Sequence, residues 1–190
     1  MPSVILRPGA NGDVIELSQY PASGYNYDKV DEETPDEDAT YVYVAATVVG
    51  LRRDLYQLPD VSLPENAIID YVKVYIRVKP QYPDYTAVSN ARIKTYGVEY
   101  SSGFSSSDGY QTFSAVWDKN PYTNQPWTQD EVNALQAGVG LFRSYFYDPE
   151  TGYFYYCQTR CTQVYVEVGY HIPPPPAVKI TYTDGLVCIA

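Results

Sequence analysis

The feature that most constrains the fold is a repeated alternation of apolar and polar residues. The segment 67–79 reads AIIDYVKVYIRVK, and Val164, Val166 and Val168 follow the same period further along the chain. Successive side chains of a strand point to opposite faces, so each such strand has one buried and one exposed face. Further runs of this kind cover residues 41–49 and 91–100. With Gly, Pro, Asn and Asp turns between the strands, the pattern predicts an all-β, antiparallel two-sheet sandwich.

One segment departs from this period. Residues 128–138 read TQDEVNALQAG, in which Thr128 and Glu131 form a capping box and Gly138 is a natural helix stop. The segment predicts one short helix. Trp127, directly before it, is expected to pack as an anchor in the core, because buried aromatic side chains are mostly structural.

Charge and composition exclude several classes of function. The 190 residues suit one domain, and the net charge of −10 argues against nucleic-acid binding, which needs a basic face. No apolar run approaches the roughly 18 residues of a membrane span, so membrane insertion is not expected. His171 is the one histidine, so a catalytic triad or a histidine metal centre would have to use it. No glycine-rich nucleotide motif occurs, and the chain is expected not to be an enzyme.

The acidic run at residues 28–38 holds seven carboxylates and one lysine. Clustered carboxylate oxygens are the ligands that Ca²⁺ prefers, although the spacing matches no EF-hand loop. The run predicts a calcium site formed by Asp31, Glu33, Asp36 and Asp38. The alternative is a solvated acidic loop that keeps the protein soluble.

Three cysteines are present, and Cys157 and Cys161 are four residues apart. Within one strand that spacing is about 13 Å, which is too long for a disulfide. A turn at residues 158–160 would allow a Cys157–Cys161 bond. We expect this bond if the protein works in an oxidising location, and Cys188 is then left as the odd cysteine.

Tyrosine is unusually abundant, with 22 residues. Several tyrosines fall in one expected hairpin, which turns at Asp148–Gly152: Tyr145, Tyr147, Tyr153, Tyr155 and Tyr156. A tyrosine ring offers an apolar face and a polar tip, which suits interfaces and sugar stacking alike. These side chains therefore either cover sheet faces, contact other subunits or contact glycans. Tyr145, Tyr147, Tyr153 and Tyr155 are the candidate contact residues.

The C-terminal segment is organised separately. The prolines at 173–176 form a stiff spacer, and Val178, Ile180 and Tyr182 beyond it share one strand face. A turn or bulge at 184–185 precedes Leu186. We divide the chain into a sandwich (1–171), a linker (172–177) and a C-terminal strand (178–190). This strand either folds back on its own sandwich, is donated to a neighbouring subunit or is disordered.

Five phrases occur in a recognisable order: VILRPGANGDVIELS, YNYDKVDEETPDEDATYV, IIDYVKVYIRVK, WDKNPYTNQPWTQDEVNALQAGV and TQVYVEVGY. Together they resemble a group of jelly-roll-like proteins from phages and environmental microbes, many of which look like tail-fibre or surface-appendage components. The resemblance covers residues 1 to about 171, and the NP…PWT…EVNALQAG block is its most specific part. It implies a jelly-roll-like β-sandwich with a structural or attachment role and no catalytic residues.

These observations predict a non-enzymatic structural subunit of a virion appendage or an extracellular filament. Copies of the chain would assemble through subunit contacts and C-terminal strand donation. Its location would be extracellular or on a virion surface, although the N-terminus shows no signal peptide. The alternative is a carbohydrate-binding adhesion module, in which exposed tyrosines contact surface glycans and a calcium ion is structural.

Overall fold

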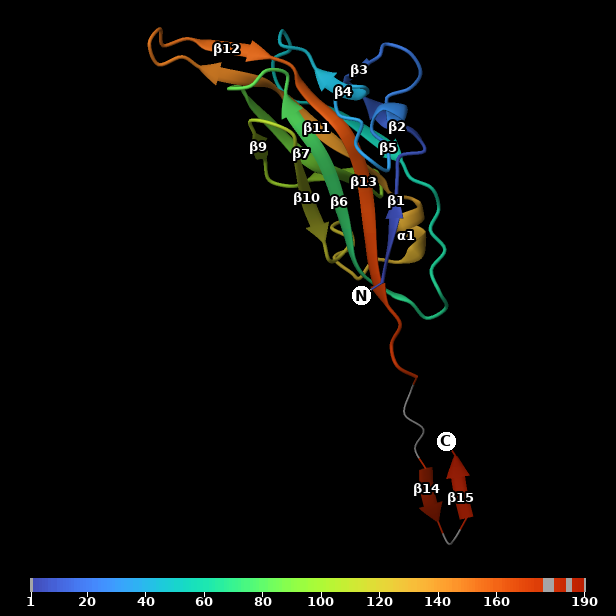
Figure 1. Cartoon of the computed structure of the whole chain (residues 1–190). Coiled ribbons are helices and arrows are strands. Elements are labelled where there is room, and N and C mark those ends of the chain that lie inside the picture. Colours follow the sequence, from blue (N-terminus) through green and yellow to red (C-terminus); the bar gives the residue numbers. More distant parts are fainter. Residues whose placement is uncertain (1, 176–179, 184–185, 190) are drawn as a thin grey trace.

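Two antiparallel sheets pack face to face in the computed structural model, which describes residues 2–175, 180–183 and 186–189 (Figure 1). We name each large sheet after one of its longest strands. Over the described residues, the β6 sheet contains β1 (Ser3–Leu6), β3 (Ser18–Tyr20), β4 (Tyr41–Val44), β6 (Ile68–Pro80), β10 (Gln111–Trp117) and β13 (Thr159–His171). The β11 sheet contains β2 (Ala10–Ile15), β5 (Arg52–Gln57), β7 (Thr86–Thr95), β8 (Val98–Ser101), β9 (Ser105–Ser107), β11 (Gln136–Tyr147) and β12 (Phe154–Cys157). The predicted all-β sandwich is confirmed.

The strand order joins segments that are far apart in the sequence. The β6 sheet runs β10-β6-β13-β4-β3, and β1 pairs with the second half of β13. The β11 sheet runs β2-β5-β11-β7-β8, while β9 pairs with β7 and β12 pairs with the end of β11. The longest strands, β6 and β13, lie side by side at the centre of their sheet.

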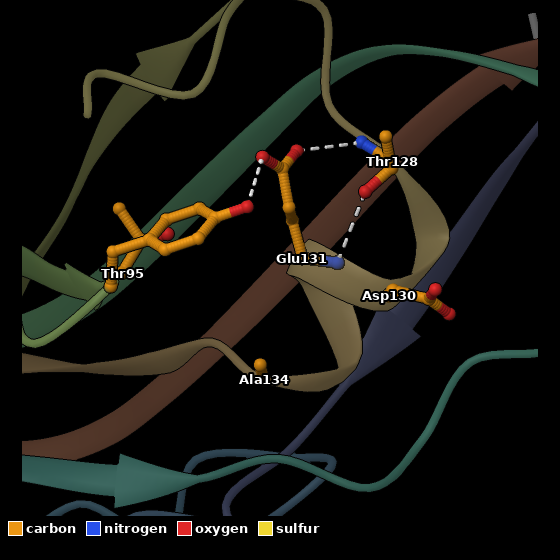
Figure 2. Close-up of a pocket in the computed structure, with 6 residues that line it drawn as sticks. Thr95, Thr128, Asp130, Glu131 and Ala134 are labelled. Carbon is orange, nitrogen blue, oxygen red and sulfur yellow. Dashed lines mark hydrogen bonds between the residues drawn. The ribbon is translucent and has the colours of Figure 1, made fainter. Parts of the chain in front are cut away.

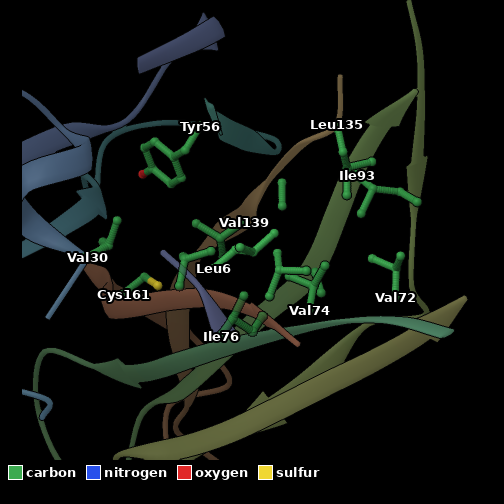
Figure 3. Close-up of a cluster of buried hydrophobic side chains, with 14 of the residues drawn as sticks. Leu6, Val30, Tyr56, Val72, Val74, Ile76, Ile93, Leu135, Val139 and Cys161 are labelled. Atoms are coloured by element: carbon green, nitrogen blue, oxygen red, sulfur yellow. The ribbon is translucent and has the colours of Figure 1, made fainter. Parts of the chain in front are cut away.

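The core lies between the sheets and follows the alternation in the sequence (Figure 3). Val72, Val74 and Ile76 of β6 are buried, while the residues between them face outward. On the opposite sheet, Val139 of β11 and Ile93 of β7 are fully buried. Period-two alternation therefore gave the correct inner face, because each sheet buries one face only.

The predicted helix is shorter than its pattern. Helix α1 (Gln129–Asn133) begins with the expected capping box between Thr128 and Glu131. It ends before Gly138, which lies instead in β11, directly against the backbone of Asp54 in β5. A side chain at Gly138 would clash with the Asp54 carbonyl, so this glycine serves close strand pairing, and its prediction as a helix stop is wrong.

Trp127 is the predicted anchor, and the structure confirms it. Its side chain is 4% exposed and packs in the core cluster. The indole Nε1 donates a hydrogen bond to the carbonyl oxygen of Trp117 at 2.8 Å. This bond ties the loop before α1 to the end of β10.

The chain changes sheets at Gln158, which separates β12 from β13. The Gln158 carbonyl accepts hydrogen bonds from the Gln81 amide (2.9 Å) and the Ser144 hydroxyl (3.1 Å). Thr159, which is fully buried, also bonds to the Ser144 hydroxyl and to the Phe142 carbonyl. These bonds hold the crossing point between the sheets.

Beyond the linker, β14 (Ile180–Thr183) and β15 (Leu186–Ile189) pair with each other in an antiparallel hairpin. Within the described residues, neither strand pairs with a strand of the two large sheets. This differs from the single C-terminal strand that the sequence predicted, and it does not match the fold-back alternative. Ile180, Tyr182 and Leu186 lie in the hairpin, and Val178 is outside the described residues. Over the described part of the chain, no helix has the length and hydropathy needed to cross a membrane.

Candidate functional site

The most distinctive surface is the hairpin formed by the end of β11 and by β12, residues 144–157, which we call the aromatic hairpin. Its tip extends past the other strands of the sandwich (Figure 1). Asp148 fixes the turn, because its side chain accepts hydrogen bonds from the amides of Glu150 and Thr151. Gly152 has a φ of +73°, a conformation that glycine adopts without strain. The predicted turn at Asp148–Gly152 is confirmed.

Large aromatic side chains of the hairpin are exposed to solvent. The exposed fractions are 37% for Tyr145, 49% for Tyr147, 69% for Tyr153, 53% for Phe154, 45% for Tyr155 and 42% for Tyr156. Single exposed apolar residues are ordinary on protein surfaces, but a contiguous exposed patch usually marks an interaction site.

The register places aromatic rings on both faces of the hairpin. On one face, Tyr145 pairs with Tyr156 and Tyr147 pairs with Phe154, with 5.0 Å between the ring centroids of Tyr147 and Phe154. On the other face, Phe146 pairs with Tyr155. A hairpin with one buried face would alternate apolar and polar residues along each strand. The aromatic hairpin does not, because neither of its faces is packed into the core.

The first face continues into a shallow depression of about 390 Å³, lined by Val49, Gly50, Val88, Phe142, Arg143, Tyr145 and Tyr156. The Arg143 guanidinium lies over the Tyr156 ring at 3.5 Å from its centroid. Cation–π contacts of this kind hold a ring in a fixed orientation. Val49, at the rim, is 74% exposed. The depression offers a concave, mostly apolar surface for binding, and Arg143 is the one cation among its lining residues.

The backbone of the hairpin also has an open edge. β12 pairs with β11 and, among the described residues, with no other strand. Proteins usually protect such edges with lysine, proline or bulges, since an unpaired edge is a template for another strand. The four residues of β12, Phe-Tyr-Tyr-Cys, contain none of these. The edge is therefore available for pairing.

The structure places all four predicted contact tyrosines in this hairpin. Sequence reasoning missed Phe146 and Phe154, which join the same surface, and Arg143, which supports it. The signal was present, because SYFY and YFYY lack the polar residues that alternate along the other strands. A strand that is apolar on both faces and lies outside the core has to expose one of them.

The acidic run at residues 28–38, which we call the acidic strap, lies on β6 and β13. Asp38 accepts hydrogen bonds from Lys79 (2.5 Å), Arg160 (2.9 Å) and Tyr110 (3.0 Å). Glu37 pairs with Arg77 at 2.6 Å. Burial tends to raise the pKa of Asp38, but the bonds from Lys79, Arg160 and Tyr110 hold it below its ordinary value. The end of the strap, Glu37 and Asp38, is therefore ion-paired to β6 and β13.

The predicted calcium ligands do not converge. Asp36 accepts hydrogen bonds from Thr40 and Thr162, and Glu33 contributes its carbonyl oxygen to Arg7. For Asp31, burial raises the pKa of the carboxyl group. Over the described residues, no group of three His, Cys, Asp or Glu side chains is placed to hold a metal ion. The prediction that these four side chains form one ligand set is therefore wrong for the described structure, in which Asp36 and Asp38 are hydrogen-bonded to other side chains. Calcium binding itself stays a prediction.

The predicted Cys157–Cys161 disulfide is also wrong. Both cysteines are free and buried. Cys157 pairs with Ser144 in the β11 sheet, whereas Cys161 lies in the β6 sheet opposite Val78. The chain stays extended from Thr159 onward, so the turn that the bond requires does not form. Burial raises the pKa of the Cys161 thiol to about 12, which keeps it protonated and unreactive.

A second depression, of about 330 Å³, lies beside α1 and is lined by Thr95, Tyr96, Thr128, Asp130, Glu131 and Ala134 (Figure 2). Glu131 accepts hydrogen bonds from the Tyr96 hydroxyl (3.2 Å) and the Thr128 amide (2.9 Å). The bond to Glu131 raises the pKa of the Tyr96 hydroxyl. The sequence predicted Thr128 and Glu131 as the capping box of α1, and it indicated no role for the other four residues.

Comparison with protein families and with curated proteins found no relative. No family model matches the chain, and no curated protein matches it. The resemblance to jelly-roll-like appendage proteins therefore stays a prediction, and the site geometry carries the functional argument.

Proposed function

We propose that the protein is a non-enzymatic structural subunit that assembles with copies of itself through the aromatic hairpin. The observation that carries the proposal is the combination of aromatic rings on both hairpin faces with an open β12 edge. Pairing a second strand with that edge would satisfy its backbone groups and cover the rings at the same time.

Charge restricts a contact between two copies to surfaces without acidic groups, and the strands of the hairpin are such a surface. Each chain carries a net charge of −10, so two copies repel over most of their surfaces. Within residues 144–157 the acidic groups are Asp148 and Glu150, both at the turn, and the paired strand segments contain none. Two β12 strands running antiparallel would form a two-fold interface, in which the same residues contact each other from both sides.

The C-terminal hairpin supplies a second contact in this proposal. β14 and β15 pair with each other, so each keeps one edge that can add to the sheet of a neighbour. A two-fold contact at the aromatic hairpin and a strand addition through the tail would together produce an extended assembly. An extracellular or virion-surface setting belongs to the proposal and rests on the resemblance alone.

The experiment measures molar mass by light scattering over a concentration series. The Tyr147→Ser/Phe154→Ser double variant removes rings from one hairpin face and leaves the core intact. The control is Tyr25→Ser/Val116→Ser, which changes two side chains exposed to 61% and 50% elsewhere on the surface. We expect the wild type and the control to reach a higher molar mass than the hairpin variant, which keeps only the contact through the tail. A wild type that is monomeric at every concentration, or a hairpin variant that assembles as the wild type does, contradicts the proposal.

A further inference from the structure

Tyr96 occupies a backbone conformation that does not suit its side chain. Tyr96 and Gly97 form the two-residue turn between β7 and β8, with φ values of +50° and +77°. Turns with two positive φ values favour Asn-Gly, because asparagine tolerates this region and bulky residues do not. The Tyr96 side chain is nevertheless 60% exposed, so core packing does not account for it. A strained, exposed aromatic residue suggests a functional contact.

The surrounding loop holds this ring in a fixed position. The Tyr122 ring stacks on Tyr96, with 4.8 Å between centroids and 17° between planes. Tyr122 is held in turn by Asn120, which is fully buried and accepts a hydrogen bond from the Tyr122 amide. The Asn120 side chain donates to Thr95 at 3.1 Å, which joins the loop to β7. The ring is therefore preorganised before any ligand arrives, which reduces the entropic cost of binding.

Hydrogen-bond donors and acceptors both line the depression beside the Tyr96 ring. Figure 2 shows Glu131 bonded to Thr128, with Thr95 and Asp130 beside the same depression. Among the described residues, no side chain or amide donates to the Asp130 carboxylate, which can accept hydrogen bonds. The hydroxyls of Thr95 and Thr128 can donate as well as accept.

We propose that this depression binds a neutral sugar ring. The C–H face of a pyranose would stack on Tyr96, its hydroxyls would donate to Asp130, and a threonine hydroxyl would donate back. A cationic ligand fits less well, since it cannot accept from the threonines and Glu131 already holds two donors. The volume of about 330 Å³ is at the small end of ligand pockets, which span roughly 300–1,000 Å³.

The sugar site is independent of the proposed assembly. Figure 1 shows α1 and the aromatic hairpin at opposite ends of the sandwich. Copies joined through the hairpin would leave the depression open, so an assembly would present many sugar sites at once. Failure of sugar binding would leave the assembly proposal standing, because the two experiments measure different quantities.

Ligand-observed NMR tests the binding of individual sugars. The probes are glucose, galactose, mannose, N-acetylglucosamine and the hexaoses of cellulose, xylan, mannan and amylose. Choline and lysine methyl ester represent cationic ligands. We expect at least one sugar to bind at millimolar concentration. Asp130→Asn and Tyr96→Ala should each weaken its affinity by about tenfold or more. Tyr82→Ala, at a ring exposed to 54% elsewhere, should not change the affinity.

Tyr96→Asn separates a binding role from a structural one. Asparagine suits the turn, so this variant should melt at the same or a higher temperature than the wild type while losing sugar binding. A purely structural role for Tyr96 predicts a lower melting temperature instead. The proposal is overturned if no sugar binds, if the Asn variant binds sugar as the wild type does, or if only the cationic probes bind.

Discussion

At the scale of single residues, Asp54 is the most heavily used polar side chain in the interior. It is fully buried, and its Oδ1 accepts the backbone amides of Glu16 and Leu17 at 2.8 Å. Its Oδ2 accepts the Asn26 amide group at 2.6 Å and the Tyr56 hydroxyl at 3.1 Å. The carboxylate thus joins β5 to the segment that precedes the acidic strap.

We expect Asp54→Asn to destabilise the protein by about 1–3 kcal/mol, because the new NH₂ group would face hydrogen-bond donors and leave them unsatisfied. Asp118→Asn is the matched control, at an exposed position whose side chain forms no hydrogen bond with the described residues. Urea denaturation of both variants measures the change in the free energy of unfolding. Equal stability of the two variants would show that the Asp54 network does not stabilise the fold.

Glu32 and Asp36 both approach the Thr40 hydroxyl at 2.8 Å. A hydroxyl has one proton, so at neutral pH one of the two carboxylates lacks a donor there. Burial raises the pKa of Glu32 above its ordinary value of 4.5. The folded state therefore binds the proton more tightly than the unfolded state, and stability falls as the pH rises from 4.5 through the folded pKa.

Glu32→Gln should consequently stabilise the protein at pH 7, by roughly 0.5–1 kcal/mol, with the gain shrinking toward pH 4.5. The control is Glu33→Gln at the adjacent exposed position. Thermal melts across this pH range test the expectation. A destabilised Glu32 variant at pH 7, or a gain that grows as the pH falls, would show that the ionised carboxylate is favourable where it lies.

At the scale of elements, the sequence was informative where the pattern is local. The period of β6 and β13 predicted their inner faces, and the capping box at Thr128 predicted the start of α1. The end of α1 was predicted wrongly because the role of Gly138 depends on β5, a distant strand.

The ion-pair partners of the acidic strap could not be predicted from residues 28–38 themselves. Glu37 pairs with Arg77, 40 positions away, and Asp38 pairs with Arg160, 122 positions away. The partners come together only when β6 and β13 lie side by side. A run of carboxylates therefore looks the same whether it binds a metal, remains solvated or pairs with a neighbouring sheet.

Removing residues 177–190 tests the role of the C-terminal hairpin. β14 and β15 make no strand pairing with the sandwich over the described residues, so the melting temperature of the body should not change. The truncated chain should form dimers through the aromatic hairpin and no larger species, because the second contact is lost. Sedimentation velocity distinguishes these species. Large assemblies formed by the truncated chain would exclude the tail as the second contact.

At the scale of the whole molecule, the two sheets form one sandwich with distinct features at its ends. The aromatic hairpin extends from one end, and α1 lies toward the other (Figure 1). The sugar-site depression is beside α1. Glu37 and Asp38 of the strap pair with the cations Arg77, Lys79 and Arg160 of β6 and β13. Six exposed aromatic side chains gather in the hairpin. This arrangement separates assembly from ligand contact.

The central claim is that the β12 edge pairs with a second copy, and hydrogen–deuterium exchange at several protein concentrations measures this edge directly. The amides of β12 that face away from β11 should exchange rapidly in dilute protein and become protected as the concentration rises. Amides of the exposed strand β10 should show no such change and serve as the internal reference. Rapid exchange along β12 at every concentration, in a sample whose molar mass shows assembly, would contradict the claim.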